Sequence, residues 1–122
     1  MTTNELKQRT KNFAVRVTRL VDALPNAVKS RAIATQIMRS TTSIAANYRA
    51  ACRARSRAEF IAKIGVVEEE ADETAFSLEL IIDTSLCGQS QIEPLLQEAG
   101  ELVAIMAASR KSAIGNRKSA IS

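Results

Sequence analysis

Apolar residues recur every three or four positions in four separate segments of the chain, and this spacing constrains the fold more than any other feature. An α-helix turns by about 100° per residue, so the spacing gathers apolar side chains on one face of each segment. No segment is a candidate strand. Only two prolines and four glycines interrupt the 122 residues. The pattern predicts an all-α fold.

Local signals divide the chain into four helices. Pro25 cannot continue a helix and ends the first. Ser56 and Glu59 have the spacing of a capping box, so Ser56 is the expected N-cap of the third helix. Gly88 is the expected C-cap that ends the third helix, and Ser90 begins the fourth. The predicted helices span about 4–24, 30–54, 57–86 and 90–109.

Four amphipathic helices with short connections are typical of an antiparallel up-down four-helix bundle. One domain over residues 1–109 is therefore expected. The residues expected to face its core are Leu6, Phe13, Val17, Leu20, Leu24, Ile33, Ile37, Thr41, Ile44, Tyr48, Cys52, Phe60, Ile64, Val67, Ala71, Thr74, Leu78, Ile82, Ile92, Leu95, Leu96, Ala99, Leu102, Val103 and Met106. Residues 110–122 repeat Arg-Lys-Ser-Ala-Ile at an interval of seven and are expected to form a flexible basic tail.

A neutral polar strip runs beside the core stripe of the second helix. Its residues are Gln36, Ser40, Ser43 and Asn47. Because Ser43 and Asn47 border the apolar residues Ile44 and Tyr48, we expect both to be partly buried and hydrogen-bonded.

The net charge of +4 conceals a strong separation of charge along the chain. Residues 1–57 hold twelve Lys and Arg against two Asp and Glu, a net charge of +10. Residues 58–109 hold one basic residue against eleven acidic ones, a net charge of −10. Three explanations are consistent with this separation of charge: salt bridges within one fold, contacts between copies of the chain, and binding of a polyanion.

The third predicted helix carries a second series of residues opposite its core face. These residues have the rhythm of a helix–helix seam and are Ala62, Val66, Glu69, Glu73, Phe76 and Leu80. In a lone bundle Phe76 and Leu80 would face water beside glutamates, and singly exposed apolar residues are common. We favour the alternative, in which this series forms an interface with another subunit.

Four arginines surround the expected corner between the second and third helices. Arg49 and Arg53 suit the negative end of the second helix dipole. Arg55 and Arg57 lie at the start of the third helix, where the dipole disfavours positive charge, so helix stability does not explain them. Phosphate contact is a physical reason for such a cluster. The candidate nucleic-acid-binding residues are Arg49, Arg53, Arg55, Arg57 and Lys63.

Composition argues against several other functions. The chain has no histidine, which is the commonest general base and metal ligand. We therefore expect no catalytic residues, no metal and no cofactor. Cys52 and Cys87 lack the spacing of a zinc or redox motif, and two reduced thiols suit a cytoplasmic protein. The N-terminus is polar, so we expect no signal peptide. No apolar run reaches the length of about 18 residues that a membrane span needs, so we expect no membrane partner.

The stretch from Arg31 to Thr74 resembles a bacterial family of four-helix-bundle proteins. This family includes proteins encoded by intervening sequences in large-subunit ribosomal RNA genes, and the stretch also resembles the accessory variability determinants of diversity-generating retroelements. The residues that carry the resemblance are Gln36, Arg39, Ser40, Ser43, Ile44, Asn47, Tyr48, Ser56, Phe60, Lys63, Glu69, Glu70, Asp72 and Glu73. The resemblance implies a homopentameric ring, nucleic-acid binding in the retroelement members, and no enzymatic activity.

Two functions are consistent with these features. The first is a non-enzymatic, oligomeric accessory protein that binds RNA or DNA mainly through phosphate contacts. The second is a structural ring scaffold that binds a protein partner, with its charges used in contacts between subunits. Salt-dependent binding of RNA would distinguish the first from the second.

Overall fold

The structure is a computed structural model that describes residues 1–121, with side chains described through residue 115. It contains four α-helices, α1 (Thr3–Ala23), α2 (Val28–Cys52), α3 (Arg57–Asp83) and α4 (Gln89–Ile121). No strand occurs in residues 1–121. The all-α prediction is confirmed, and most helix bounds lie within three residues of those expected.

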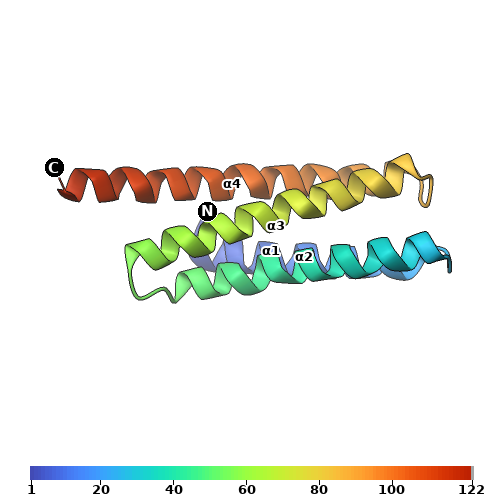
Figure 1. Cartoon of the computed structure of the whole chain (residues 1–122), viewed down its shortest axis with the longest axis horizontal. Helices are drawn as coiled ribbons and strands as arrows, with labels where there is room; N and C mark the ends of the chain where they lie inside the picture. Colours follow the sequence, from blue (N-terminus) through green and yellow to red (C-terminus); the bar gives the residue numbers. More distant parts are fainter. Residues whose placement is uncertain (122) are drawn as a thin grey trace.

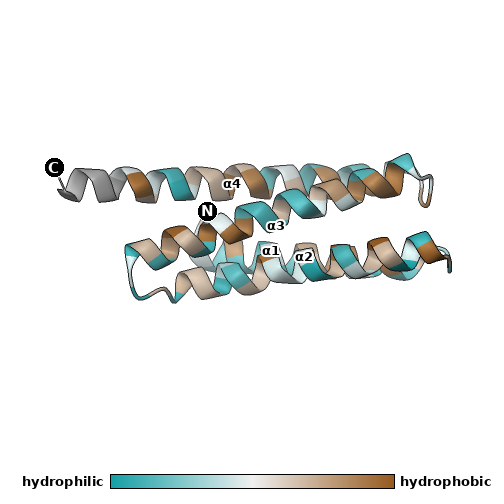
Figure 2. Ribbon diagram, viewed as in Figure 1, coloured by the Kyte–Doolittle hydropathy of each residue, from teal (hydrophilic) through white to brown (hydrophobic). Residues whose placement is uncertain are grey.

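Each helix runs antiparallel to the one before it, as short connections require (Figure 1). α3 packs closely against both α2 and α4, and α1 packs against α2. Of the helix pairs that pack together, α1 and α4 approach each other least. Hydrophobic and hydrophilic residues are interspersed along α2, α3 and the part of α4 that is coloured in Figure 2, and buried apolar residues of all four helices form one cluster. The bundle is therefore closed around one apolar core, with its loosest seam between the first and last helices.

Most residues of the predicted core are buried. The exceptions are only half-buried: Leu24, Ile33, Cys52, Phe60, Ile82, Leu96 and Val103. Ser77 and Ile81 of α3 are buried although the pattern did not include them. The physical reason is that α3 lies against two helices at once, so its buried stripe is wider than a single a/d series.

Ser56 is the N-cap of α3, as predicted. Its Oγ accepts a hydrogen bond from the backbone N–H of Glu59 at 3.0 Å. The Glu59 carboxylate accepts from the backbone N–H of Arg55, at 3.0 Å, and so reaches one residue further back than a reciprocal capping box would. These two bonds separate α2 from α3 without glycine or proline.

The predicted C-cap at Gly88 is wrong. α3 ends at Asp83, and Ser85 takes the left-handed conformation with φ of 56°. The Ser85 N–H donates to the carbonyl of Ile82 at 3.0 Å, and the Leu86 N–H donates to that of Ile81 at 3.1 Å. These bonds define a Schellman motif, which ends the helix before Gly88 is reached.

The fourth helix extends beyond residue 109, where the sequence pattern ended it, and the division into a bundle over 1–109 and a tail over 110–122 stays a prediction. α4 continues without a break to Ile121, and the Arg110 Nε atom donates to Glu68 Oε2 of α3 at 2.9 Å. The pair raises the pKa of Arg110 above its usual value. The side chains after residue 115 lie outside those described, and the flexibility of this segment stays a prediction.

Candidate nucleic-acid interface

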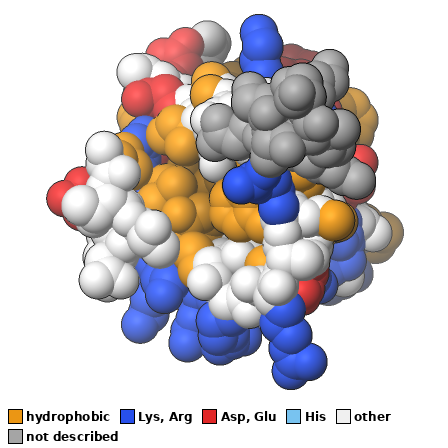
Figure 3. Space-filling model, turned by 90° about the vertical axis from the view of Figure 1, so that its left-hand side faces the viewer, with side chains coloured by type: hydrophobic (Ala, Val, Ile, Leu, Met, Phe, Trp, Pro, Cys, Tyr) orange, Lys and Arg blue, Asp and Glu red, His pale blue; other side chains and the backbone are white. Residues whose placement is uncertain are grey.

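The fold brings the predicted basic residues to one end of the bundle. Arg49 lies in the last turn of α2, Arg53 is its C-cap, and Arg55 lies in the connection. Arg57 is the first residue of α3, and Lys63 lies in its second turn. Lys63 is half-buried, and the four arginines are exposed. Figure 3 looks onto this end and shows Lys and Arg side chains gathered along one side of it.

None of these five cations forms an ion pair with a carboxylate of residues 1–115. The ion pairs within that range use other arginines, Arg9, Arg39 and Arg110, each of which contacts a glutamate on a neighbouring helix. Salt bridges within the fold therefore account for part of the charge separation and leave the basic end uncompensated.

Arg49 differs from the other four predicted cations in its surroundings. It lines a groove between α1 and α2 together with Lys7 and Lys11, neither of which the sequence pattern singled out. The signal that could have found them is the spacing of four between the two lysines, which places them on one side of α1. Their proximity to Arg49 depends on the register of two helices, which periodicity alone leaves open.

The predicted subunit-contact residues share one exposed face of α3. Phe76 is 60% exposed and Val66 36% exposed, while Leu80 is half-buried. Phe76 and Leu80 also line a groove of about 400 Å³ between α2 and α3, where Ile33 supplies further apolar surface. The single chain thus leaves an apolar face in contact with water, as the second seam on α3 implies.

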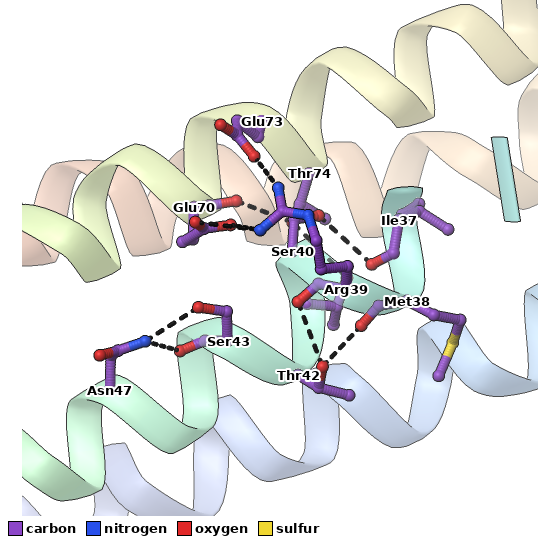
Figure 4. Close-up of polar contacts among 11 residues, drawn as sticks. Ile37, Met38, Arg39, Ser40, Thr42, Ser43, Asn47, Glu70, Glu73 and Thr74 are labelled. Carbon is purple, nitrogen blue, oxygen red and sulfur yellow. Dashed lines mark hydrogen bonds and ion pairs between the residues drawn. The ribbon is translucent and has the colours of Figure 1, made fainter. Parts of the chain in front are cut away.

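Ion pairs lie at the edge of this groove. The Arg39 Nη1 atom of α2 lies 3.2 Å from Glu70 Oε2 of α3, and Arg39 Nη2 contacts Glu73 (Figure 4). Hydrogen bonds from the guanidinium to the two carboxylates raise the pKa of Arg39. Glu73, one of the predicted subunit-contact residues, therefore has a partner within its own chain.

Buried hydroxyl groups join α2 to α3 beneath these ion pairs. Ser40 Oγ and Thr74 Oγ1 lie 2.7 Å apart, and both residues are buried (Figure 4). The Thr74 hydroxyl also donates to the Glu70 carbonyl at 2.9 Å. This hydrogen-bonded polar contact inside an apolar core favours one register of the two helices, since an axial shift would break the bond between Ser40 and Thr74.

The prediction for Ser43 and Asn47 is confirmed. Both are half-buried. Asn47 Nδ2 donates to the Ser43 carbonyl at 3.0 Å and to Ser43 Oγ at 2.9 Å (Figure 4). These partners belong to α2 itself, so the polar strip here does not link helices.

The basic end also holds an apolar hollow, visible at the centre of Figure 3. Its lining includes Leu6, Tyr48, Cys52, Phe60 and Ile105. Burial raises the pKa of Tyr48 to about 12, and the neighbouring Cys52 thiol adds to the shift. Tyr48 is therefore a neutral phenol over the physiological pH range.

Two further findings bear on function. Within the described residues, no group of three His, Cys, Asp or Glu side chains is placed to hold a metal ion. None of the four helices, over the same residues, has the length and apolar content that a bilayer crossing requires.

A four-helix bundle with an uncompensated basic end is the class that fold and charge define. The chain belongs to the 23S rRNA-intervening sequence protein family, which matches residues 2–108. It is similar to a crystal structure from Bacteroides thetaiotaomicron VPI-5482, described as a protein with unknown function from the S23 ribosomal protein family. The two share 38% sequence identity and a TM-score of 0.83, over 91% of this chain and 99% of that chain. No curated protein matches.

Proposed function

We propose that this protein is a non-enzymatic, oligomeric accessory protein that binds RNA or DNA through phosphate contacts at its basic end. The observation that carries the proposal is the group of five cations without a carboxylate partner among residues 1–115. Membership of the family of rRNA intervening-sequence proteins supports a nucleic-acid context for such charge.

Binding of this kind is expected to be indifferent to sequence. Phosphate contacts supply affinity and position but do not read bases. Stacking on bases needs exposed rings, and of the four aromatic residues only Phe76 is well exposed, on the far side of α3 from the core. Electrostatic attraction to the phosphates of the nucleic acid is the remaining source of affinity.

Oligomerisation would strengthen this binding. The exposed face formed by Phe76, Val66 and Leu80 supports contact with a second copy, and the family resemblance favours five copies in a ring. Because each subunit would present the same basic end, weak individual contacts would combine through avidity.

The direct test removes the charge at the corner. A variant with Arg53→Gln, Arg55→Gln and Arg57→Gln should bind labelled RNA more weakly and flatten the dependence of log affinity on log salt by about 2 to 3 units. The matched control is Arg16→Gln, Arg19→Gln and Lys29→Gln, which removes equal charge from exposed positions away from the basic end. The control should retain most of the binding.

Two outcomes would contradict the proposal. Failure of the wild type to bind any nucleic acid at about 50 mM salt, where phosphate contacts are strong, would exclude nucleic-acid binding. Loss of the oligomer in the Arg53, Arg55 and Arg57 variant would assign these arginines to subunit contacts. That result would support the structural scaffold for a protein partner instead.

A further inference from the structure

A groove of about 670 Å³ runs along the seam between α1 and α2, separate from the α2–α3 corner. Small side chains leave this space open, because Ala14, Thr42, Ala45 and Ala46 stand where larger residues would fill the seam. The remaining lining residues are Asn4, Lys7, Gln8, Lys11 and Arg49. The groove therefore has a floor of small residues and walls of basic and amide side chains.

The charge in the groove has one sign. Lys7 and Lys11 lie one helical turn apart on α1, about 6 Å along the axis, and Arg49 faces them from α2. No carboxylate lines the groove, and α2 contains no acidic residue over its whole length. Within α1, the Glu5 carboxylate accepts a hydrogen bond from the backbone N–H of the N-cap residue Thr2, and Asp22 lies in the last turn, away from the lysines.

The neighbouring ion pair leaves this charge in place. Arg9 lies between the two lysines in sequence, yet its guanidinium is directed to Glu98 and Glu101 of α4. Lys7, Lys11 and Arg49 form no ion pair with a carboxylate of residues 1–115. No carboxylate of residues 1–115 therefore neutralises the three charges that line the groove.

We propose that the α1–α2 groove holds the phosphodiester backbone of the bound nucleic acid. The phosphodiester backbone carries one negative charge per nucleotide, so it suits three cations spread along a groove. The small residues on the groove floor leave room for this backbone, and the contact does not involve bases. Arg53 lies one turn beyond Arg49 on α2, so a further cation lies between the groove and the basic corner. The inference rests on the proposed function and adds a binding groove that the sequence pattern did not reveal.

The first test removes the groove charge. In the full chain, Lys7→Gln, Lys11→Gln and Arg49→Gln together should remove three phosphate contacts, each with a slope of about 0.7 to 0.9 in log affinity against log salt. From 50 to 200 mM salt, the wild-type affinity should then fall about 20- to 40-fold more than that of the variant. Fluorescence anisotropy with a labelled single-stranded RNA, and with the DNA of the same sequence, gives both values and distinguishes the two sources of phosphodiester.

The second test fills the groove and keeps its charge. Ala46 is exposed on the groove floor, so Ala46→Phe should obstruct the backbone and weaken binding at least about tenfold if the groove is occupied. Thr35→Phe, at an exposed position of α2 outside the groove, is the matched control and should bind as the wild type does. Circular dichroism of each variant checks that the helices are intact.

The outcomes separate this inference from the proposed function. Binding by the wild type that survives both groove variants but is lost in the corner variant would overturn the groove and leave the proposed function standing. If charge removal weakens nucleic-acid binding but Ala46→Phe does not, the cations attract the nucleic acid at long range without holding it in the groove. That result would also overturn the groove proposal. A changed sedimentation mass in the charge variant would assign the groove to the acidic face of a second copy. No binding by the wild type would reject the proposed function itself.

Discussion

Arg9 of α1 and Glu98 of α4 form a bidentate ion pair across the loosest seam of the bundle. Arg9 Nε lies 2.8 Å from Glu98 Oε2, and Arg9 Nη2 lies 2.6 Å from Glu98 Oε1. The hydrogen bond to Glu98 raises the pKa of Arg9, with some opposition from burial. Since α1 and α4 share few other close approaches, this pair helps to close the bundle between its first and last helices.

Removing the charge on Glu98 should loosen that seam. Glu98→Gln keeps the size of the side chain but loses the paired charge, and we expect the free energy of unfolding to fall by about 1 kcal/mol. The fall should shrink at high salt. Urea denaturation measures it. Glu79→Gln, at an exposed position on α3, is the control and should leave the midpoint unchanged. Equal midpoints for both variants would show that the pair contributes nothing.

The buried hydroxyl contact gives a second stability prediction. Thr74→Val leaves the Ser40 hydroxyl with only the Ile37 carbonyl, at 3.3 Å, and should cost about 1 to 3 kcal/mol. Adding Ser40→Ala should recover part of this loss, because the buried Ser40 hydroxyl, left with one long hydrogen bond, is then removed. Thr42→Val is the exposed control, with an expected cost below about 0.5 kcal/mol. Additive losses in a double-mutant cycle would contradict the coupling.

The turn between α3 and α4 predicts opposite effects at two neighbouring positions. Ser85 has a positive φ that glycine adopts without strain, so Ser85→Gly should stabilise the protein by roughly 0.5 to 1 kcal/mol. Gly88 has no positive φ, and a Cβ atom there would meet nothing within 4 Å. Gly88→Ala should therefore be tolerated. A thermal melt that shows Gly88→Ala to be the more damaging change would restore Gly88 as the cap.

Tyr48 gives a pH prediction that one chromophore can report. The chain has one tyrosine and no tryptophan, so tyrosinate absorbance belongs to Tyr48 alone. Burial should place its midpoint at about 12 in the folded protein, against about 10 in denaturant. Because the pKa is raised on folding, its contribution to stability is complete below pH of about 10 and is lost as pH rises towards 12.

The neighbouring thiol provides the control for this titration. Cys52→Ala should lower the pKa of Tyr48 in the folded protein, because the thiol contributes to the shift. A folded midpoint near that of the denatured chain would show that the phenol is solvated.

The apolar face of α3 predicts assembly. Sedimentation equilibrium should give several times the monomer mass of 13.2 kDa, with five copies favoured by the family resemblance. Phe76→Glu should weaken the assembly, because it would bury an additional carboxylate close to Glu69 and Glu73. Val28→Glu, at another apolar position that is 76% exposed, is the control and should leave the mass unchanged. A wild-type monomer at micromolar concentration would rule out the interface.

Periodicity predicted the four helices and most of the core because burial against a neighbour requires a continuous apolar face. Ile37, Ile64 and Leu102 are examples of residues placed correctly by spacing alone. Helix ends were harder to predict. Ser85 rather than Gly88 adopts the left-handed conformation, and the residue after it, Leu86, packs against the core, a tertiary contact that a local turn signal does not reveal.

The candidate site was predictable only in part. Arg53, Arg55 and Arg57 are neighbours in sequence, so their proximity needed no knowledge of the fold. Lys7 and Arg49 are brought together by the register of α1 against α2, which a single helical pattern does not specify. The partner of Glu73 was missed for the same reason, because Arg39 reaches it from another helix.

The unequal charge of the helices also affects how the molecule moves before any contact is made. α1 and α2 carry an excess of Lys and Arg, and α3 carries an excess of Asp and Glu on another side of the bundle. Such a molecule has a permanent electric dipole moment and rotates in the field of a charged polymer. A polyanion would turn the α1–α2 side towards itself at a distance of about a Debye length, so salt should slow encounter more than it speeds dissociation.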